Sequence, residues 1–369
     1  MDKKNAYLPN LDILRFLAAL AVVGTHYGYV GPHWGVTGYA PPTGILENFL
    51  RVGWIGVPIF FAMSGFLIPY VTKNSDPFSY GFARALRLLP GFWVCMTISF
   101  LFLTLLNDSY SGSFMTWFAN LFMLPEILGQ VHVDGVYWTL VFEFIFYGWA
   151  GIFIAFGVFH KHILKISALW LLFISIKFFI LKDSSFGQLF ILSLGSAFIV
   201  GMVLWSIYEK GISLLAVAIL IGATIQLSFN LQIVSTQTYL PTPPLPLSLA
   251  VTTGLSIFVV SVVAAAIFLP QIKFGTNQLY TLGAISYPLY LLHQEIGYTI
   301  FRRFAYLGQP LILITGTTLF ILVLSFMINK TVERPSRKLL QPYADQLSSL
   351  LQSGVKKVLN TPFFPIKNK

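Results

Sequence analysis

The sequence has few charged residues and a single cysteine. Asp, Glu, Lys and Arg together make up 10% of the 369 residues, whereas 56% of the residues are hydrophobic. Such a chain carries more apolar surface than one soluble core can bury. The lone Cys95 permits neither an intrachain disulfide nor a cysteine-based metal cluster. The composition therefore excludes a soluble, disulfide-stabilised protein and indicates a protein of the lipid bilayer.

Apolar segments of membrane-spanning length recur along the whole chain. About 20 helical residues cross roughly 30 Å of hydrocarbon. We therefore predict an all-α polytopic membrane protein with about ten transmembrane helices. The predicted spans cover residues 13–30, 53–72, 88–106, 136–158, 163–181, 187–207, 212–229, 248–269, 279–301 and 309–329.

Two of the outer connections, 31–52 and 107–135, are long. The connection 107–135 contains SFMTWFANLFMLPE, which is apolar but too short to cross, so we expect a re-entrant or interfacial helix there. Little sequence is left for a second domain. We predict a transmembrane domain over 1–335 and a short basic cytoplasmic tail over 336–369.

The distribution of basic residues sets the orientation. With the N-terminus inside, most short inner segments are basic, and both termini face the cytoplasm. The inner residues are Lys3, Lys4, Lys73, Arg84, Arg87, Lys161, Lys165, Lys210, Lys273 and those of the tail; the outer ones are Arg51, Lys177, Lys182, Arg302 and Arg303. The net charge of +10 then reflects contact with anionic membrane lipids, and no nucleic-acid partner is expected.

Two polar residues interrupt the first apolar segment. Arg15 and His26 are eleven residues apart, which places them on one helix face, separated by about 16 Å of rise. A cation at one end and an imidazole at the other suit a long ligand with an anionic head and a reactive tip. The alternative is that each side chain extends to the nearer headgroup region.

Arg84 and Arg87 form a second basic pair at the inner end of the third span. They are three residues apart and so share a helix face. Guanidinium groups bind phosphate bidentately, and we expect Arg15, Arg84 and Arg87 to hold a phosphorylated ligand. The positive-inside rule alone would also explain this pair.

Three titratable side chains lie at a similar predicted depth near the outer side. They are His26, Glu143 and His293, on three different spans. A carboxylate beside an imidazole orients it and stabilises its charged form, so we predict His26 as a general base and Glu143 as its catalytic partner. Glu143 could instead belong to a structural hydrogen-bond network.

Six segments, in order, resemble the acyltransferase 3 family of bacterial membrane acyltransferases. They are LDILRFLAALAVVGTH, FFAMSGFLI, FARALRLLP, YWTLVFEFIFYG, ISYPLYLLHQ and VERPSRK, and the similarity extends from about residue 10 to 340. The resemblance is to the stand-alone form, without an appended periplasmic hydrolase-like domain. It implies a catalytic His26 and a cytoplasmic acyl-CoA donor, by family habit acetyl-CoA, held by Arg15, Arg84 and Arg87.

The resemblance further implies O-acylation of a cell-surface glycan, or its lipid-linked precursor, at a bacterial inner membrane. We expect a carbohydrate acceptor to contact Trp138, Tyr287, Tyr290 and His293, although aromatic packing is the common role of such rings. No metal is predicted. The acceptor, the oligomeric state and the choice between direct transfer and an acyl-histidine intermediate stay open. A glycan or lipid-linked sugar flippase, which needs no acyl donor, is the alternative function.

Overall fold

The computed structural model describes residues 7–73, 75–107, 110–179, 193–236 and 247–360. In these ranges the regular structure is entirely helical, as predicted. The helices are α1 (Pro9–Thr25), α2 (Gly31–His33), α3 (Ile45–Val52), α4 (Gly56–Val71), α5 (Pro77–Leu106), α6 (Phe114–Asn120), α7 (Trp138–Ala155), α8 (Ile163–Phe179), α9 (Gly195–Lys210), α10 (Leu214–Thr236), α11 (Leu249–Phe268), α12 (Thr276–Phe304), α13 (Pro310–Ile328) and α14 (Arg334–Asn360).

Seven helical segments of the described chain are long and apolar enough to cross a membrane. They coincide with seven of the ten predicted spans. The other three spans contain α8, α9 and α12. Helices α8 and α9 are 17 and 16 residues long in the described part of the chain, and α12 has 29 residues but carries many polar side chains. The polarity of α12 follows from its position against the functional site described below.

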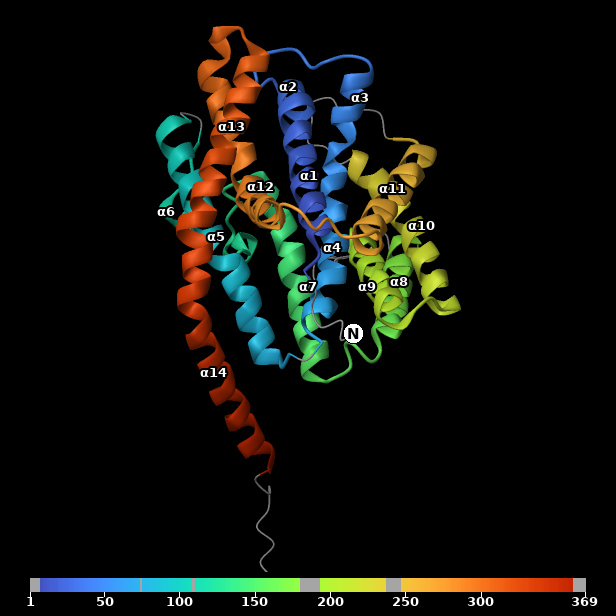
Figure 1. Cartoon of the computed structure of the whole chain (residues 1–369). Helices are drawn as coiled ribbons and strands as arrows, with labels where there is room; N and C mark the ends of the chain where they lie inside the picture. Colours follow the sequence, from blue (N-terminus) through green and yellow to red (C-terminus); the bar gives the residue numbers. More distant parts are fainter. Residues whose placement is uncertain (1–6, 74, 108–109, 180–192, 237–246, 361–369) are drawn as a thin grey trace, which may run out of the picture.

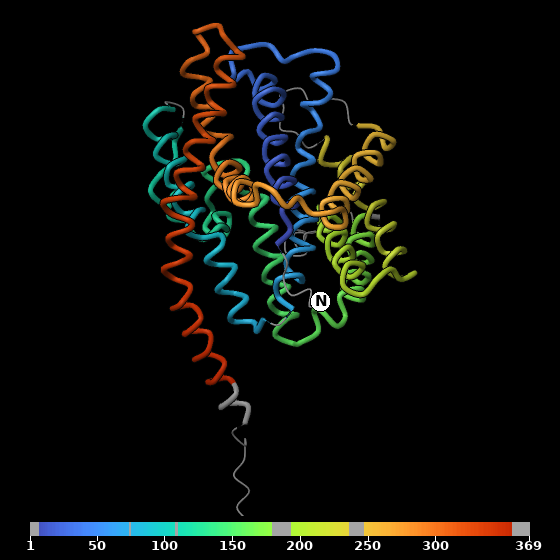
Figure 2. The backbone as a smooth tube through the Cα atoms, viewed as in Figure 1, coloured from blue at the N-terminus to red at the C-terminus, as the bar shows by residue number. Residues whose placement is uncertain are grey.

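The helices form two groups around a central set (Figure 1). Helices α1, α4 and α7 occupy the middle, α8 to α11 lie on one side, and α5, α6, α13 and α14 lie on the other. The tube in Figure 2 shows that α13 leads into α14, which extends beyond the rest of the bundle. Helix α1 begins and α14 ends toward the same end, which matches the prediction that both termini face one side of the membrane.

Small residues allow α4 and α9 to pack closely. A Cβ atom at Gly65 would overlap the carbonyl oxygen of Phe198, and one at Gly201 would overlap the carbonyl oxygen of Ala62. Close backbone approach through small residues is a common way to join helices in a bilayer, where lipid supplies no hydrophobic drive for association. Ser64, beside Gly65, points instead toward α7. Of these two neighbouring residues, Gly65 therefore contacts α9 and Ser64 contacts α7.

The segment between α5 and α7 re-enters the bundle beside α5. Trp117 Nε1 of α6 donates to Thr97 Oγ1 at 3.0 Å, and Trp93 Nε1 donates to the carbonyl oxygen of Leu121 at 2.9 Å. These partners lie well below the C-terminal end of α5, so the chain returns along the helix that it has just left. With 7 residues, α6 is too short to cross, which confirms that part of the prediction.

The predicted basic tail begins inside α14, and α14 packs along the first turns of α5. Ser348 is 1% exposed; its hydroxyl lies 2.8 Å from that of Ser79 and donates to Asp76 at 3.3 Å. Asp76 also caps α5, accepting from the backbone nitrogens of Phe78 and Ser79. This contact anchors α14 beside the N-terminal end of α5. The division into domains at residue 335 stays a prediction.

The α4–α9 contact predicts a position-specific loss of stability. Gly201→Ala places a methyl group against the backbone of α4 and should destabilise the protein by about 1–3 kcal/mol, the usual cost of overpacking. Gly316→Ala is the matched control, because nothing lies within 4 Å of its added Cβ. Thermal unfolding in detergent should show a lower midpoint for the first variant alone. Equal midpoints would contradict the described contact.

Candidate active site

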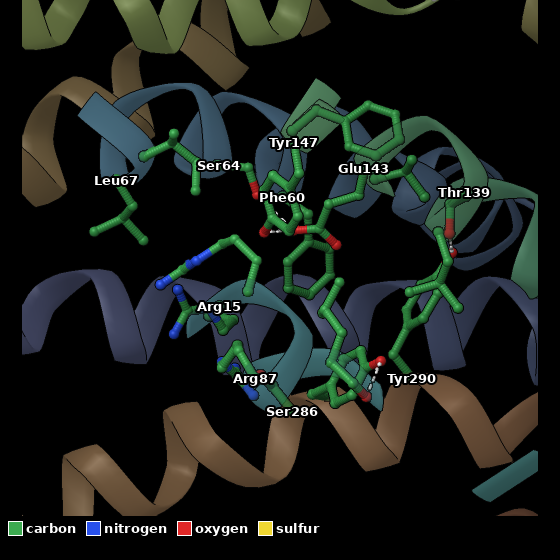
Figure 3. A pocket seen from close by; sticks show the side chains of 17 residues that line it. Arg15, Phe60, Ser64, Leu67, Arg87, Thr139, Glu143, Tyr147, Ser286 and Tyr290 are labelled. Atoms are coloured by element: carbon green, nitrogen blue, oxygen red, sulfur yellow. Dashed lines mark hydrogen bonds between the residues drawn. The ribbon is translucent and has the colours of Figure 1, made fainter. Parts of the chain in front are cut away.

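An internal cavity of about 110 Å³ lies among five helices, α1, α4, α5, α7 and α12. We call it the inner cavity. Figure 3 shows side chains that line it, with Arg15 and Arg87 on one side and Glu143 on the other. The lining comprises Arg15, Val57, Phe60, Phe61, Ser64, Leu67, Ile68, Arg84, Arg87, Leu88, Thr139, Leu140, Glu143, Tyr147, Ser286, Tyr287 and Tyr290.

The three arginines singled out in the sequence meet at this cavity. Arg15 donates to Asp12 at 2.9 Å, one turn earlier on α1. Arg87 lies 3.9 Å from the Glu333 carboxylate, and its guanidinium is 5.4 Å from the centre of the Tyr287 ring.

Arg84 differs from the other two arginines. Its guanidinium lies 5.8 Å from the centre of the Tyr147 ring, and its buried Nε has no hydrogen-bond partner among the described residues. A buried donor without a partner costs free energy. Arg84 is therefore the arginine best prepared to bind an anionic ligand.

Glu143 faces the inner cavity and not His26. Its Oε1 accepts from Ser64 Oγ at 2.9 Å and also from the hydroxyl of Tyr147. The prediction that Glu143 orients the His26 imidazole is wrong for this structure. Counting residues along a helix predicts a depth, but the direction of each side chain depends on how the helices are rotated against one another.

The partner of His26 is His293. His26 Nδ1 lies 2.7 Å from His293 Nε2, and His293 Nδ1 lies 2.8 Å from the carbonyl oxygen of Tyr290. His293 is fully buried, at 0% exposure, whereas His26 is partly exposed. His293 therefore meets the other imidazole directly, and its predicted contact with a sugar is not supported by its position.

These contacts determine where the protons lie. A carbonyl oxygen only accepts, so His293 Nδ1 must carry the hydrogen that bonds to Tyr290. Burying a charge costs far more than burying a neutral ring, so both imidazoles are assigned as neutral. His293 Nε2 is then the acceptor and His26 Nδ1 the donor. This leaves an unprotonated nitrogen, Nε2, on His26, which is the form that a general base requires.

A break in helical geometry occurs at His26. Residues His26–Val30 form a single π-helical turn between α1 and α2, and such turns are frequent at functional sites. A Cβ atom at Gly31 would lie 2.8 Å from the His26 carbonyl oxygen, so glycine permits this turn. The Tyr298 hydroxyl donates to the same oxygen at 3.4 Å. The wider turn thus fixes His26 against α12.

The return of the re-entrant segment closes the outer end of the site. Asp134 accepts from the backbone nitrogen of Glu295 at 3.1 Å, two residues beyond His293. Burial, together with the nearby Glu295 carboxylate, raises the pKa of Asp134 well above its usual range. The hydrogen bond to Glu295 holds the returning segment against α12.

The predicted acceptor-binding aromatics separate into two groups. Tyr287 and Tyr290 line the inner cavity. Trp138 does not; it is 38% exposed and packs edge-on against Phe142. Its position at the start of α7 leaves the ring outside the described site, so the predicted role of Trp138 finds no support in the structure.

Tyr290 connects the inner cavity with the histidine pair. It lines the cavity, its ring centre lies 5.7 Å from that of His293, and its hydroxyl lies 2.9 Å from that of Thr139. The lining does not include His26 or His293. A ligand reaching His26 from the cavity must therefore pass the layer formed by Tyr290, Thr139 and Phe60.

Several polar residues of this site have no distinctive sequence pattern. Thr139, Tyr147 and Ser286 line the cavity, but hydroxyl residues are too common in membrane helices to be selected by pattern. Glu333 has a clearer sequence signal, because it is an acidic residue in an otherwise basic segment. It pairs with Arg87 across about 246 residues of sequence, a contact that no spacing rule predicts.

The fold and the site define a class of protein. It is a multi-pass helical membrane protein with a cationic internal cavity and a pair of histidines in direct contact. Comparison then identifies the family: a model of the acyltransferase domain matches residues 8–330. The chain belongs to the acyltransferase 3 family, which confirms the resemblance inferred from the six segments.

One curated relative carries a functional name. An O-acetyl transferase of Shigella phage Sf6 is 30% identical over 170 residues, which cover 42% of this chain and 47% of the phage protein. The chain thus spans about half the length of the curated relative that it matches. No solved structure matches the chain.

The histidine pair predicts specific tautomers. ¹⁵N NMR of histidine-labelled protein in nanodiscs should show one pair of rings protonated at Nδ1 at neutral pH. Replacement of His293 by Gln should remove one ring's signals and shift those of His26. Nε2 protonation of His26 in the wild type would contradict the assignment.

Proposed function

We propose that the protein is a membrane O-acyltransferase of a bacterial inner membrane. It moves an acyl group from cytoplasmic acyl-CoA to a hydroxyl of a cell-surface glycan or its lipid-linked precursor. The observation that carries the proposal is the 2.7 Å contact of His26 Nδ1 with His293 Nε2, which leaves His26 Nε2 available as a base, beyond Tyr290 of an arginine-lined cavity. Family membership and the named phage relative support the reaction class.

The arginines account for donor binding. Coenzyme A carries phosphates at one end and the thioester at the other, so the molecule suits a path that begins with cations and ends at a neutral base. Arg84 has a donor without a partner, and Arg15 and Arg87 are already oriented by carboxylates. Guanidinium groups bind phosphate with two parallel hydrogen bonds. We assign all three to the coenzyme.

The transfer step uses His26 as the base. The acceptor hydroxyl gives its proton to His26 Nε2 as its oxygen bonds to the acyl carbon. The carbon–sulfur bond then breaks, and the coenzyme leaves as a thiolate that takes up a proton from the imidazolium or from water. Such base assistance contributes roughly 10²- to 10⁴-fold. In the alternative route, His26 Nε2 itself attacks the carbonyl and holds the acyl group before the acceptor arrives.

His293 and Glu143 act as positioning residues in this scheme. His293 holds the reactive tautomer of His26. Glu143 fixes Ser64 and Tyr147 on the cavity wall opposite Arg87. Tyr287 and Tyr290 lie on the path to the histidine pair and would contact the ligand there. The carbohydrate acceptor would approach His26 from its exposed, outer side.

Loss of the base should abolish the reaction. His26→Ala should release no coenzyme A from labelled acetyl-CoA in the presence of acceptor, whereas His293→Gln should lower kcat with little change in the KM for the donor, because Gln supplies only part of the His293 hydrogen bonding. Thiol release by purified protein measures both.

Near-wild-type transfer in His26→Ala would overturn the assignment of the base. A wild-type protein that moves glycans across vesicles but never releases thiol would establish the flippase alternative.

Donor binding should depend on Arg84. Arg84→Ala should raise the KM for acetyl-CoA by about tenfold or more, the size expected for one charge-assisted hydrogen bond of roughly 1.5–3 kcal/mol. Arg303→Ala is the matched control, because Arg303 is an exposed cation in the last turn of α12, at the outer end of the protein. Equal KM values for the two variants would contradict the assignment of Arg84.

A further inference from the structure

A second, larger cavity opens at the inner end of the protein. We call it the inner basin; its volume is about 770 Å³, within the range of small-molecule sites. It lies between the start of α1, the first part of α5, the start of α12 and the junction of α13 with α14. The lining comprises Tyr7, Asp12, Arg15, Ala83, Leu86, Arg87, Tyr280, Ala284, Asn329, Glu333, Arg334, Arg337, Lys338 and Gln341.

The basin carries an excess of positive charge. Each carboxylate of its lining lies beside an arginine. Asp12 accepts from Arg15 and from the Tyr7 hydroxyl. Glu333 Oε2 accepts from Asn329, and Glu333 Oε1 lies 3.9 Å from Arg87 without a hydrogen bond in the described part of the chain. The three remaining cations, Arg334, Arg337 and Lys338, all come from the first turns of α14.

These three cations lack acidic partners in the described part of the chain. Arg334 donates to the neutral Asn329 and Thr281 at 2.9 and 3.0 Å. For Arg337 and Lys338, no salt bridge is observed with any described carboxylate. Their charge is therefore available to an anion that enters the basin.

Two exposed aromatic rings lie at the same cavity. Tyr280 is 46% exposed and Tyr7 is 44% exposed, with ring centres 6.2 Å apart. The Arg334 guanidinium lies 5.4 Å from the centre of the Tyr280 ring. Exposed aromatic and guanidinium planes are the usual stacking surfaces for a nucleobase. An anionic lipid headgroup would use the cations but would have no use for these rings.

The basin and the inner cavity share two residues. Arg15 and Arg87 line both, so a ligand seated in the basin has its next contacts at the mouth of the inner cavity. The order along this path is aromatic rings with free cations, then the two shared arginines, then the inner cavity and Tyr290.

We propose that the inner basin binds the adenosine 3′-phosphate portion of the donor. Tyr280 and Tyr7 contact the adenine, and Arg337 and Lys338 bind the 3′-phosphate. The diphosphate reaches Arg15 and Arg87, and the pantetheine arm continues into the inner cavity. This inference rests on the proposed function and deepens it, because it assigns residues outside the inner cavity to the nucleotide end of the donor.

Binding of adenosine 3′,5′-bisphosphate tests the basin without any turnover. Calorimetry with the full protein in zwitterionic nanodiscs should show binding, and Arg337→Ala/Lys338→Ala should weaken it by roughly tenfold or more. Adenosine 5′-monophosphate should bind less tightly to the wild type and should lose little in the double variant. Lys330→Ala is the control, because Lys330 is exposed one turn earlier and does not line the basin.

Donor analogues separate this inference from the proposed function. The double variant should have a raised KM for acetyl-CoA but wild-type turnover of an acetyl-pantetheine thioester, which lacks the nucleotide. An unchanged affinity for the bisphosphate would overturn the inference while leaving acyl transfer standing. Loss of binding on addition of phosphatidylglycerol would identify a lipid site and would also overturn it. Absence of transfer from every donor would instead refute the proposed function.

Discussion

The structure depends on keeping buried charges paired. An ionised side chain inside a bilayer is costly unless it meets an opposite charge or hydrogen-bond partners. Asp12 compensates Arg15 on the same helix, and Glu333 lies beside Arg87 from the other end of the chain. Two glycines make room for these carboxylates: a Cβ at Gly283 would overlap Asp12, and one at Gly91 would lie 2.6 Å from Glu333 Oε1. The same glycines therefore allow both the close packing of the helices and the pairing of the charges. They bring α12 close to α1, and the α13–α14 junction close to α5.

This pairing divides the interior into two electrostatic regions. Cations from α1, α5 and α14 gather toward the inner end, where their carboxylate partners hold the guanidinium groups in place without neutralising all of them. The histidine pair lies beyond Tyr290 in a region where hydrogen bonds, and not charges, fix the rings. A phosphorylated donor and a neutral base need different surroundings, because phosphates require compensation by cations whereas a base must keep its lone pair free. Placing the two regions along α1 satisfies both requirements within one helix.

Part of the site could be predicted because it is a property of single helices. Arg15 and His26 share a face of α1, and Arg84 and Arg87 share a face of α5, since helical rise and rotation are constant. The shortness of α6 could be predicted in the same way. Glu143 shows where this reasoning stops: residue counting predicts a depth similar to that of His26, but its carboxylate turns toward Ser64 and Tyr147. Depth follows from counting residues, whereas direction follows from the rotation of α7 against α4 and α12.

Composition, local periodicity and short ordered motifs are enough to predict the class of the protein, most of the spans, the orientation expected from basic residues and the family. Which polar groups meet depends instead on the packing of helices that are distant in the chain. His26 and His293 are 267 residues apart, and their contact exists because α1 packs on α12 with one rotation and one register. The rotation and the register of α1 on α12 result from many small packing contacts, including those at glycines where the backbones approach closely. No single segment of the sequence specifies them.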